Sequence, residues 1–159
     1  MSSRKPLSDN KKRKMRSVTR LYALQALFQM EQSKQSVDVV RSEFLSYRFG
    51  AEYEGEKLEK GDVDLFTHII NEAVNQQAKI DQLTHKALVE KWPLGRIDPT
   101  LRALFRAAGA ELVKANTAPR VILVEYVDLA GAFFPDGKEA SFVNAVLDHM
   151  AHETYPKGF

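Results

Sequence analysis

The residues best suited to chemistry in this sequence are basic side chains gathered near the N-terminus, and the chemistry they suit is the binding of anions. Residues 1–20 carry eight lysines and arginines against one acid, Asp9, which gives a local charge of +7. Residues 21–159 carry fifteen bases and twenty acids, so a net charge of +2 conceals a basic arm on an acidic body. Lys and Arg donate hydrogen bonds to phosphates, and each contact releases counterions. Binding of a polyanion is one interpretation, and a tail that only aids solubility is the other.

The spacing of the basic residues favours the first interpretation. Lys12, Arg16 and Arg20 recur every four residues, and Arg13 lies on the same broad face if a helix begins near Lys12. Like charges four residues apart destabilise a helix by a few tenths of a kcal/mol per pair, so a bound polyanion would offset a real cost. We therefore expect these four residues to contact nucleic acid.

Two weaker basic features lie further along the chain. Arg102 and Arg106 are neighbours at i and i+4 on a predicted helix, where they could bind phosphate, lie on a solvated face or pair with a nearby acid. Lys138 lies just ahead of the last predicted helix, near its positive dipole end, where it could bind a phosphate or simply be solvated.

Catalytic signals are weak, and we expect no enzyme, no metal and no cofactor. The sequence has no cysteine, which excludes disulfides, zinc–thiolate sites, iron–sulfur clusters and thiol nucleophiles. His149 and His152 have a spacing that can place two ligands on one helix face, but the sequence nominates no third or fourth ligand. Glycine-rich phosphate loops, nucleophile elbows and dinucleotide fingerprints are absent from the sequence.

The elements that position these residues are predicted to be helices, because apolar residues recur at helical spacing along most of the chain. Ser36, Asp62 and Asp98 are good N-cap residues, and Pro99 fits the first position of the helix that follows Asp98. The apolar stripes at helical spacing predict about seven helices, with a break near residue 79, a surface loop over the acidic residues 50–61 and a turn at 136–137, before the last helix.

One segment is ambiguous between strand and helix. Residues 121–124 are all aliphatic and read alone would be a strand. The periodic stretch nevertheless spans some sixteen residues, and at about 100° per residue its apolar positions gather on one side. We predict a helix there and an all-α chain.

The composition is that of an ordinary globular domain, with 44% hydrophobic and 28% charged residues. We expect residues 1–11 to form a mobile basic arm and residues 12–159 a single helical domain with two lobes, over approximately 12–90 and 98–155. The first twenty residues are too polar for a secretory signal, and no apolar run reaches the ~20 residues of a membrane span. We therefore expect a soluble, cytoplasmic protein without membrane contact.

Several stretches together resemble the NusB family of transcription antitermination factors. The similarity runs from about residue 12 to residue 150, and its specific part is the sequence FVNAVLD at 142–148 together with its distance from VEYVDLA at 124–130. ALQALF at 23–28 and LRALFR at 101–106 add to it.

The resemblance implies an all-α fold of two small packed helical lobes. It also implies binding to the single-stranded boxA element of ribosomal RNA transcripts, jointly with the small-subunit ribosomal protein NusE, within an RNA polymerase antitermination complex. By position, the family's RNA-binding arm matches Lys12, Arg13, Arg16 and Arg20, with weaker matches at Arg102, Arg106 and Lys138. Phe28 closes the first motif and is expected on the surface that meets the protein partner. The alternative is a helical protein–protein interaction module without specific RNA binding.

Overall fold

The computed structural model describes residues 8–49, 52–53, 56–57, 61–91, 97–114 and 116–159. Within this part of the chain the protein is all-α, as predicted, with seven helices and one pair of two-residue strands. The helices are α1 (Asp9–Ser33), α2 (Val37–Tyr47), α3 (Val63–Asn75), α4 (Gln77–Lys91), α5 (Pro99–Val113), α6 (Pro119–Phe133) and α7 (Lys138–Thr154). The strands β1 (Glu52–Tyr53) and β2 (Glu56–Lys57) pair antiparallel. They lie within the predicted 50–61 loop, whose other residues except Gly61 lie outside the described residues.

Local capping chemistry explains where these helices begin. The side chains of Ser36, Asp62 and Asp98 accept hydrogen bonds from backbone N–H groups in the first turns of α2, α3 and α5, which confirms all three predicted caps. Gly137 has φ 84°, a left-handed conformation that glycine adopts without steric cost, and it turns the chain directly into α7. The ambiguous segment is helical, as α6.

Two predicted boundaries are wrong. The first helix was expected to begin near Lys12, but it begins at Asp9, because the Ser8 side chain accepts from the Lys11 N–H and Asp9 adds an acid to the first turn. Residues 9–11 of the predicted arm are thus the first residues of α1, and residues 1–7 lie outside the described residues. The break expected near residue 79 occurs at Gln76, between α3 and α4.

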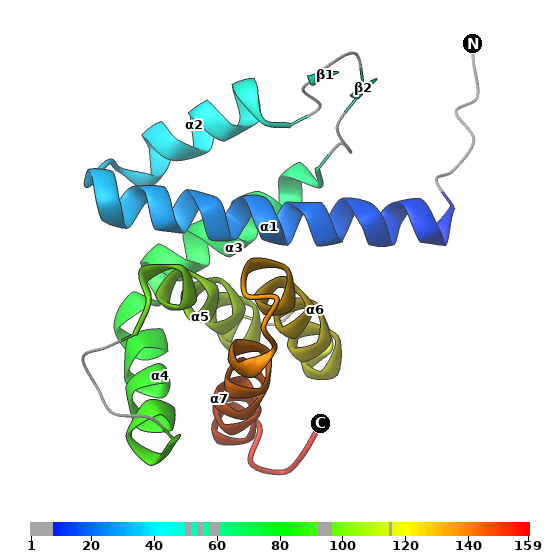
Figure 1. Ribbon diagram of the computed structural model, residues 1–159. Coiled ribbons are helices and arrows are strands. Elements are labelled where there is room, and N and C mark those ends of the chain that lie inside the picture. Colours follow the sequence, from blue (N-terminus) through cyan, green and yellow to red (C-terminus); the bar gives the residue numbers. More distant parts are fainter. Residues whose placement is uncertain (1–7, 50–51, 54–55, 58–60, 92–96, 115) are drawn as a thin grey trace.

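The long helix α1 organises the molecule. It packs against α2 and α3 and, on another side, against α5 and α6 (Figure 1). Helix α5 is the most buried element, and it contacts α1, α3, α4, α6 and α7. The contacts of α4 are chiefly with α5 and α7. One continuous cluster of buried apolar side chains runs through all seven helices.

The N-terminal turns of α1 extend beyond the other helices, on the right in Figure 1. The described part of the basic arm is thus the projecting N-terminal end of α1, and the same helix continues into the core of the protein. No helix in the described ranges is long and apolar enough to cross a membrane.

Candidate nucleic-acid interface

The N-terminal part of α1 presents a strip of cationic side chains to solvent. Lys12, Arg13 and Arg16 are exposed, as are Lys11 and Lys14 beside them. None of the five makes a side-chain hydrogen bond or ion pair with any other described residue. Below, the basic face means Lys12, Arg13 and Arg16. Three unpaired cations on consecutive turns of a rigid helix form a surface suited to a chain of phosphates.

A shallow hollow of about 420 Å³ lies beside the basic face, between α1 and α6. Its walls combine the cations Arg13 and Lys14 with the apolar side chains Val18, Leu21 and Leu129. Such a lining offers apolar contact next to groups that bind phosphate.

Arg20, the fourth predicted contact, is not on this surface. Its side chain is 1% exposed, and its guanidinium donates two hydrogen bonds to the Glu111 carboxylate on α5, from Nε to Oε2 at 2.9 Å and from Nη2 to Oε1 at 3.0 Å. Burial works against the charge of Arg20, but the hydrogen bond and charge of Glu111 outweigh it and raise the pKa of Arg20 above its ordinary value. Arg20 was predicted to lie on the exposed face that contacts nucleic acid. The structure shows it buried instead, because its side chain forms an ion pair with Glu111 inside the protein.

The Arg20–Glu111 pair has a further buried member. The Tyr126 hydroxyl on α6 donates to Glu111 Oε2 at 2.6 Å, and burial, reinforced by the Glu111 charge, raises the pKa of Tyr126 well above its usual value. Glu125 Oε1 lies 3.9 Å from Arg20 Nη1. Below, the buried cluster means Arg20, Glu111 and Tyr126, which tie α1, α5 and α6 together at one point.

Arg102 and Arg106 form ion pairs with nearby acids, one of the alternatives open from the sequence. Arg102 donates from both Nε and Nη2 to the Glu31 carboxylate, with an Nε–Oε2 distance of 2.7 Å. Arg106 donates from Nη1 to Glu31 Oε2 at 2.8 Å and from Nε and Nη2 to the Asp81 carboxylate, both at 3.1 Å. The hydrogen bond from Arg102 is the largest influence on the pKa of Glu31 and lowers it. Both arginines keep part of their surface exposed, but their charges are largely balanced.

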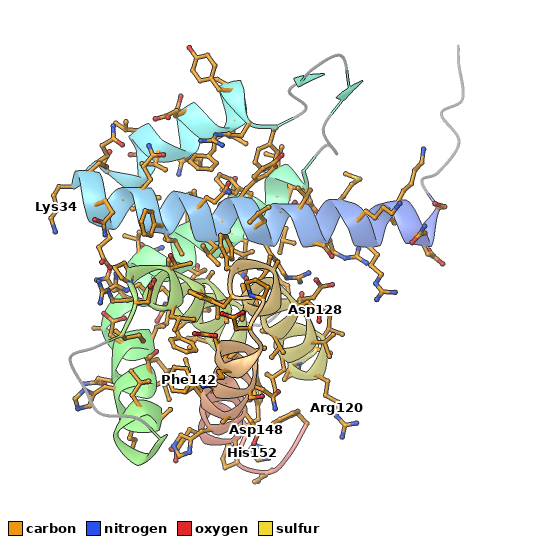
Figure 2. All side chains as sticks on the ribbon, viewed as in Figure 1. Lys34, Arg120, Asp128, Phe142, Asp148 and His152 are labelled. Atoms are coloured by element: carbon orange, nitrogen blue, oxygen red, sulfur yellow. The ribbon has the colours of Figure 1, made fainter. Side chains whose placement is uncertain are left out.

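Lys138 is exposed and is the first residue of α7. It lies at the rim of a hollow of about 320 Å³ whose lining includes Leu101, Phe134 and Phe142. The sequence alone does not indicate this hollow, although Phe142 follows Lys138 by one helical turn. Figure 2 shows Phe142, whose ring meets that of Phe105 edge-on with 6.1 Å between centroids.

Phe28 is half-exposed on α1, at 37% of its surface. It opens onto a third hollow, of about 530 Å³, together with Leu24, Phe44 and Phe133 among others. A partly exposed aromatic ring in an apolar recess is typical of a surface that receives a side chain from a protein partner.

The histidines near the C-terminus make local contacts. His152 Nδ1 lies 2.8 Å from the Asp148 carbonyl oxygen, and the two side chains lie close together at that end of α7 in Figure 2. His149 Nε2 lies 3.8 Å from Glu153 Oε1. Among the residues that the structure describes, no group of three or more His, Asp or Glu side chains could hold a metal ion.

These features define a class: an all-helical protein with a projecting cationic helix and an apolar recess on the same helix. Comparison with known proteins places it more closely. A family model described as "NusB family" matches residues 17–152. The chain is 39% identical over 156 residues to the transcription antitermination protein NusB of Granulibacter bethesdensis, covering 94% of this chain and 95% of that protein. It is 44% identical over 139 residues to the protein of the same name from Caulobacter vibrioides, covering 87% and 93%. The chain belongs to the NusB family of transcription antitermination factors.

A solved structure agrees on the fold. A chain in the structure described as "Crystal Structure of a Plectonemic RNA Supercoil" aligns with a TM-score of 0.71 at 20% identity, over 90% of this chain and 97% of that one. At this identity the likeness concerns the fold alone.

Proposed function

We propose that the protein is a non-catalytic RNA-binding adaptor of transcription antitermination in the cytoplasm. It binds single-stranded boxA-type RNA of ribosomal RNA transcripts together with the ribosomal protein NusE, and so joins the RNA polymerase antitermination complex. The observation that carries this proposal is the basic face, three unpaired cations on a projecting helix in a chain of the NusB family.

The basic face supplies affinity rather than base preference in this proposal. Cations that bind phosphates orient the RNA but do not read its sequence. The hollow beside Lys138 and Phe142 supports a role in base contact, because a partly buried ring next to a cation can stack a base while the lysine holds its phosphate. Arg102 and Arg106 contribute through their exposed edges, since Glu31 and Asp81 balance much of their charge.

The recess around Phe28 is the proposed site for the NusE partner. It is mainly apolar, and it lies on the part of α1 remote from the basic face. RNA and protein can therefore occupy the same helix without competing for the same side chains.

A test of the RNA-binding role removes the three cations of the basic face. For single-stranded RNA, the slope of log K against log salt changes by about 0.7 per phosphate contact, so the variant with Lys12, Arg13 and Arg16 replaced by Ala should be shallower by about 2. Its affinity for a boxA-type RNA should fall at least ten-fold in a filter-binding or fluorescence-anisotropy titration at low salt.

The matched control removes the same charge elsewhere. Lys79, Lys114 and Lys157 are exposed and lie outside the proposed surface, so their replacement by Ala should change affinity and slope much less. Equal effects of the two triple variants would mean that net charge, and not the basic face, governs binding.

The second candidate is a helical module that binds only protein. The apolar recess around Phe28 and the internal pairing of Arg20, Arg102 and Arg106 favour it. It predicts that the basic-face variant binds NusE normally and that the wild-type protein does not distinguish boxA-type from scrambled RNA.

A further inference from the structure

The base of the basic arm is fixed by polar contacts that reach α1 from three other parts of the chain. Arg20 is held by Glu111 of α5, within the buried cluster. Ser17 Oγ donates to Glu125 Oε2 of α6 at 2.9 Å. Thr19 Oγ1 accepts from the Asp62 backbone N–H at the start of α3, at 2.7 Å.

These contacts lie immediately C-terminal to the exposed basic residues. Arg16 precedes Arg20 by one turn, and Lys12 precedes it by two. On the C-terminal side of Arg20, α1 is anchored by the apolar side chains of Tyr22, Ala23 and Leu24, all buried. Arg20 and its fully buried neighbour Thr19 are thus the last deeply buried residues of α1 before the helix leaves the body of the protein.

We infer that Arg20 is a positioning residue for RNA binding: its ion pair with Glu111 fixes the direction in which the basic face projects, and Arg20 itself contacts no RNA. This inference rests on the proposed function. The Arg20 guanidinium donates two hydrogen bonds to the Glu111 carboxylate, and the Tyr126 hydroxyl holds that carboxylate in place. Because two parallel hydrogen bonds restrict rotation as well as distance, the pair fixes the orientation of α1 relative to α5.

A small change in the direction of α1 at Arg20 produces a large displacement of the basic face, because the two are separated by about two turns of helix. Eight residues of helix separate Arg20 from Lys12, a distance of about 12 Å at 1.5 Å per residue. A tilt of about 20° at Arg20 would move Lys12 by about 4 Å, which exceeds the range over which charge-assisted hydrogen bonds form. Loosening the pair therefore weakens several phosphate contacts at once.

The variant Glu111→Gln should change RNA affinity in opposite directions, depending on whether Arg20 positions the helix or contacts RNA itself. It removes a negative charge and frees a guanidinium, so a phosphate-binding Arg20 would gain affinity for RNA. Positioning predicts instead that affinity for single-stranded RNA falls by about three- to ten-fold. The conservative variant Arg20→Lys keeps the charge but loses the bidentate fork, and it should weaken binding in the same way.

The direction of the arm can be measured without RNA. The sequence has no cysteine, so spin labels can be placed at Asn10→Cys on the arm and Ala132→Cys on α6, both exposed positions. Electron–electron double resonance should give a narrow distance distribution in the parent and a broader one when Glu111→Gln is added. Circular dichroism checks that each protein is folded at the temperature used.

A destabilised variant with an intact cluster separates positioning from simple loss of stability. Leu147→Ala opens a cavity beside α7 and should lower the melting temperature, with no change in the label distance or in RNA affinity below its unfolding transition. A Glu111→Gln protein that binds RNA as well as or better than the parent, or keeps the narrow distance distribution, would overturn the inference. Failure of the proposed function is distinguishable, because Arg16→Ala would then also leave RNA affinity and salt slope unchanged.

Discussion

Removing either partner of the Arg20–Glu111 pair should destabilise the protein strongly, and removing both should cost much less. Both side chains are almost completely buried, at 1% and 2% exposure, so a single variant leaves an uncompensated group inside the protein. Breaking a buried ion pair in this way typically costs about 3–5 kcal/mol, that is about a fifth or more of the ~5–15 kcal/mol that stabilises a whole domain. We expect about 3–5 kcal/mol for Glu111→Leu. Among the residues that the structure describes, the only other carboxylate near Arg20 is that of Glu125, whose oxygen is 3.9 Å away.

The double variant Arg20→Met with Glu111→Leu replaces the pair by apolar side chains of similar size, an exchange that is often neutral elsewhere. The Tyr126 hydroxyl then loses its acceptor, at a cost of about 1–3 kcal/mol, which adding Tyr126→Phe should recover. The double-mutant cycle should thus give a coupling energy of about 3 kcal/mol or more.

Urea unfolding followed by circular dichroism at pH 7 measures each member of the cycle. The surface pair Arg41–Asp38, 2.6 Å between Nη2 and Oδ1, is the control, and Asp38→Ala should cost at most about 1 kcal/mol because the pair is solvated. Additive effects of Arg20→Met and Glu111→Leu, or single costs no larger than that control, would refute the reasoning.

Two further predictions concern the ion pairs of Glu31 and the contact between α4 and α5. The pKa of Glu31 is lowered in the folded protein by its hydrogen bond from Arg102, so its contribution is present above the unfolded pKa of about 4.5 and is lost as pH falls below it. The stability difference between wild type and Glu31→Gln in urea should accordingly shrink from pH 7 to about pH 3, and a constant difference would contradict the assignment. Separately, a Cβ at Gly109 would lie 2.4 Å from Ile80 Cγ2, so Gly109→Ala should lower the melting temperature through overpacking of about 1–3 kcal/mol. Gly131→Ala, with open space at its Cβ, is the helical control and should raise the melting temperature; a similar change in both variants would argue against a tight α4–α5 contact.

Local signals predicted most of the fold. The caps at Ser36, Asp62 and Asp98 and the periodic stripes between them depend on residues a few positions apart, which sequence reading can compare directly. The start of α1 was missed by three residues although Ser8 and Asp9 carry its signal, an N-cap residue followed by an acid. The N-cap rule that predicted the other helix starts would also have predicted this one at Ser8.

The role of Arg20 could not be predicted with the same means. Its partner Glu111 is 91 residues away, and only the folded chain brings the two together. A partial signal exists, since Arg20 precedes the buried Ala23 and Leu24 by three and four residues and so continues the core stripe of α1. Charge periodicity assigned Arg20 to the solvent face, and apolar periodicity would have assigned it to the core.

The remaining site residues also divide into those that local sequence predicts and those that depend on tertiary packing. Lys12, Arg13 and Arg16 are exposed as predicted, and most of their neighbours in the sequence are basic or polar, with Met15 the exception. The hollow around Lys138 is formed by residues from α5, α7 and the segments before them, so its existence depends on packing that no single stretch of sequence encodes.

The most direct test of the proposed function compares RNAs with and without the protein partner. Binding of a boxA-type RNA and of a scrambled RNA of equal length is measured by gel shift, with the chain alone and with NusE present. The account predicts preference for the boxA-type RNA, tighter binding when NusE is added, and loss of both when Lys12, Arg13 and Arg16 are replaced by Ala. Equal binding of the two RNAs in both conditions would contradict it.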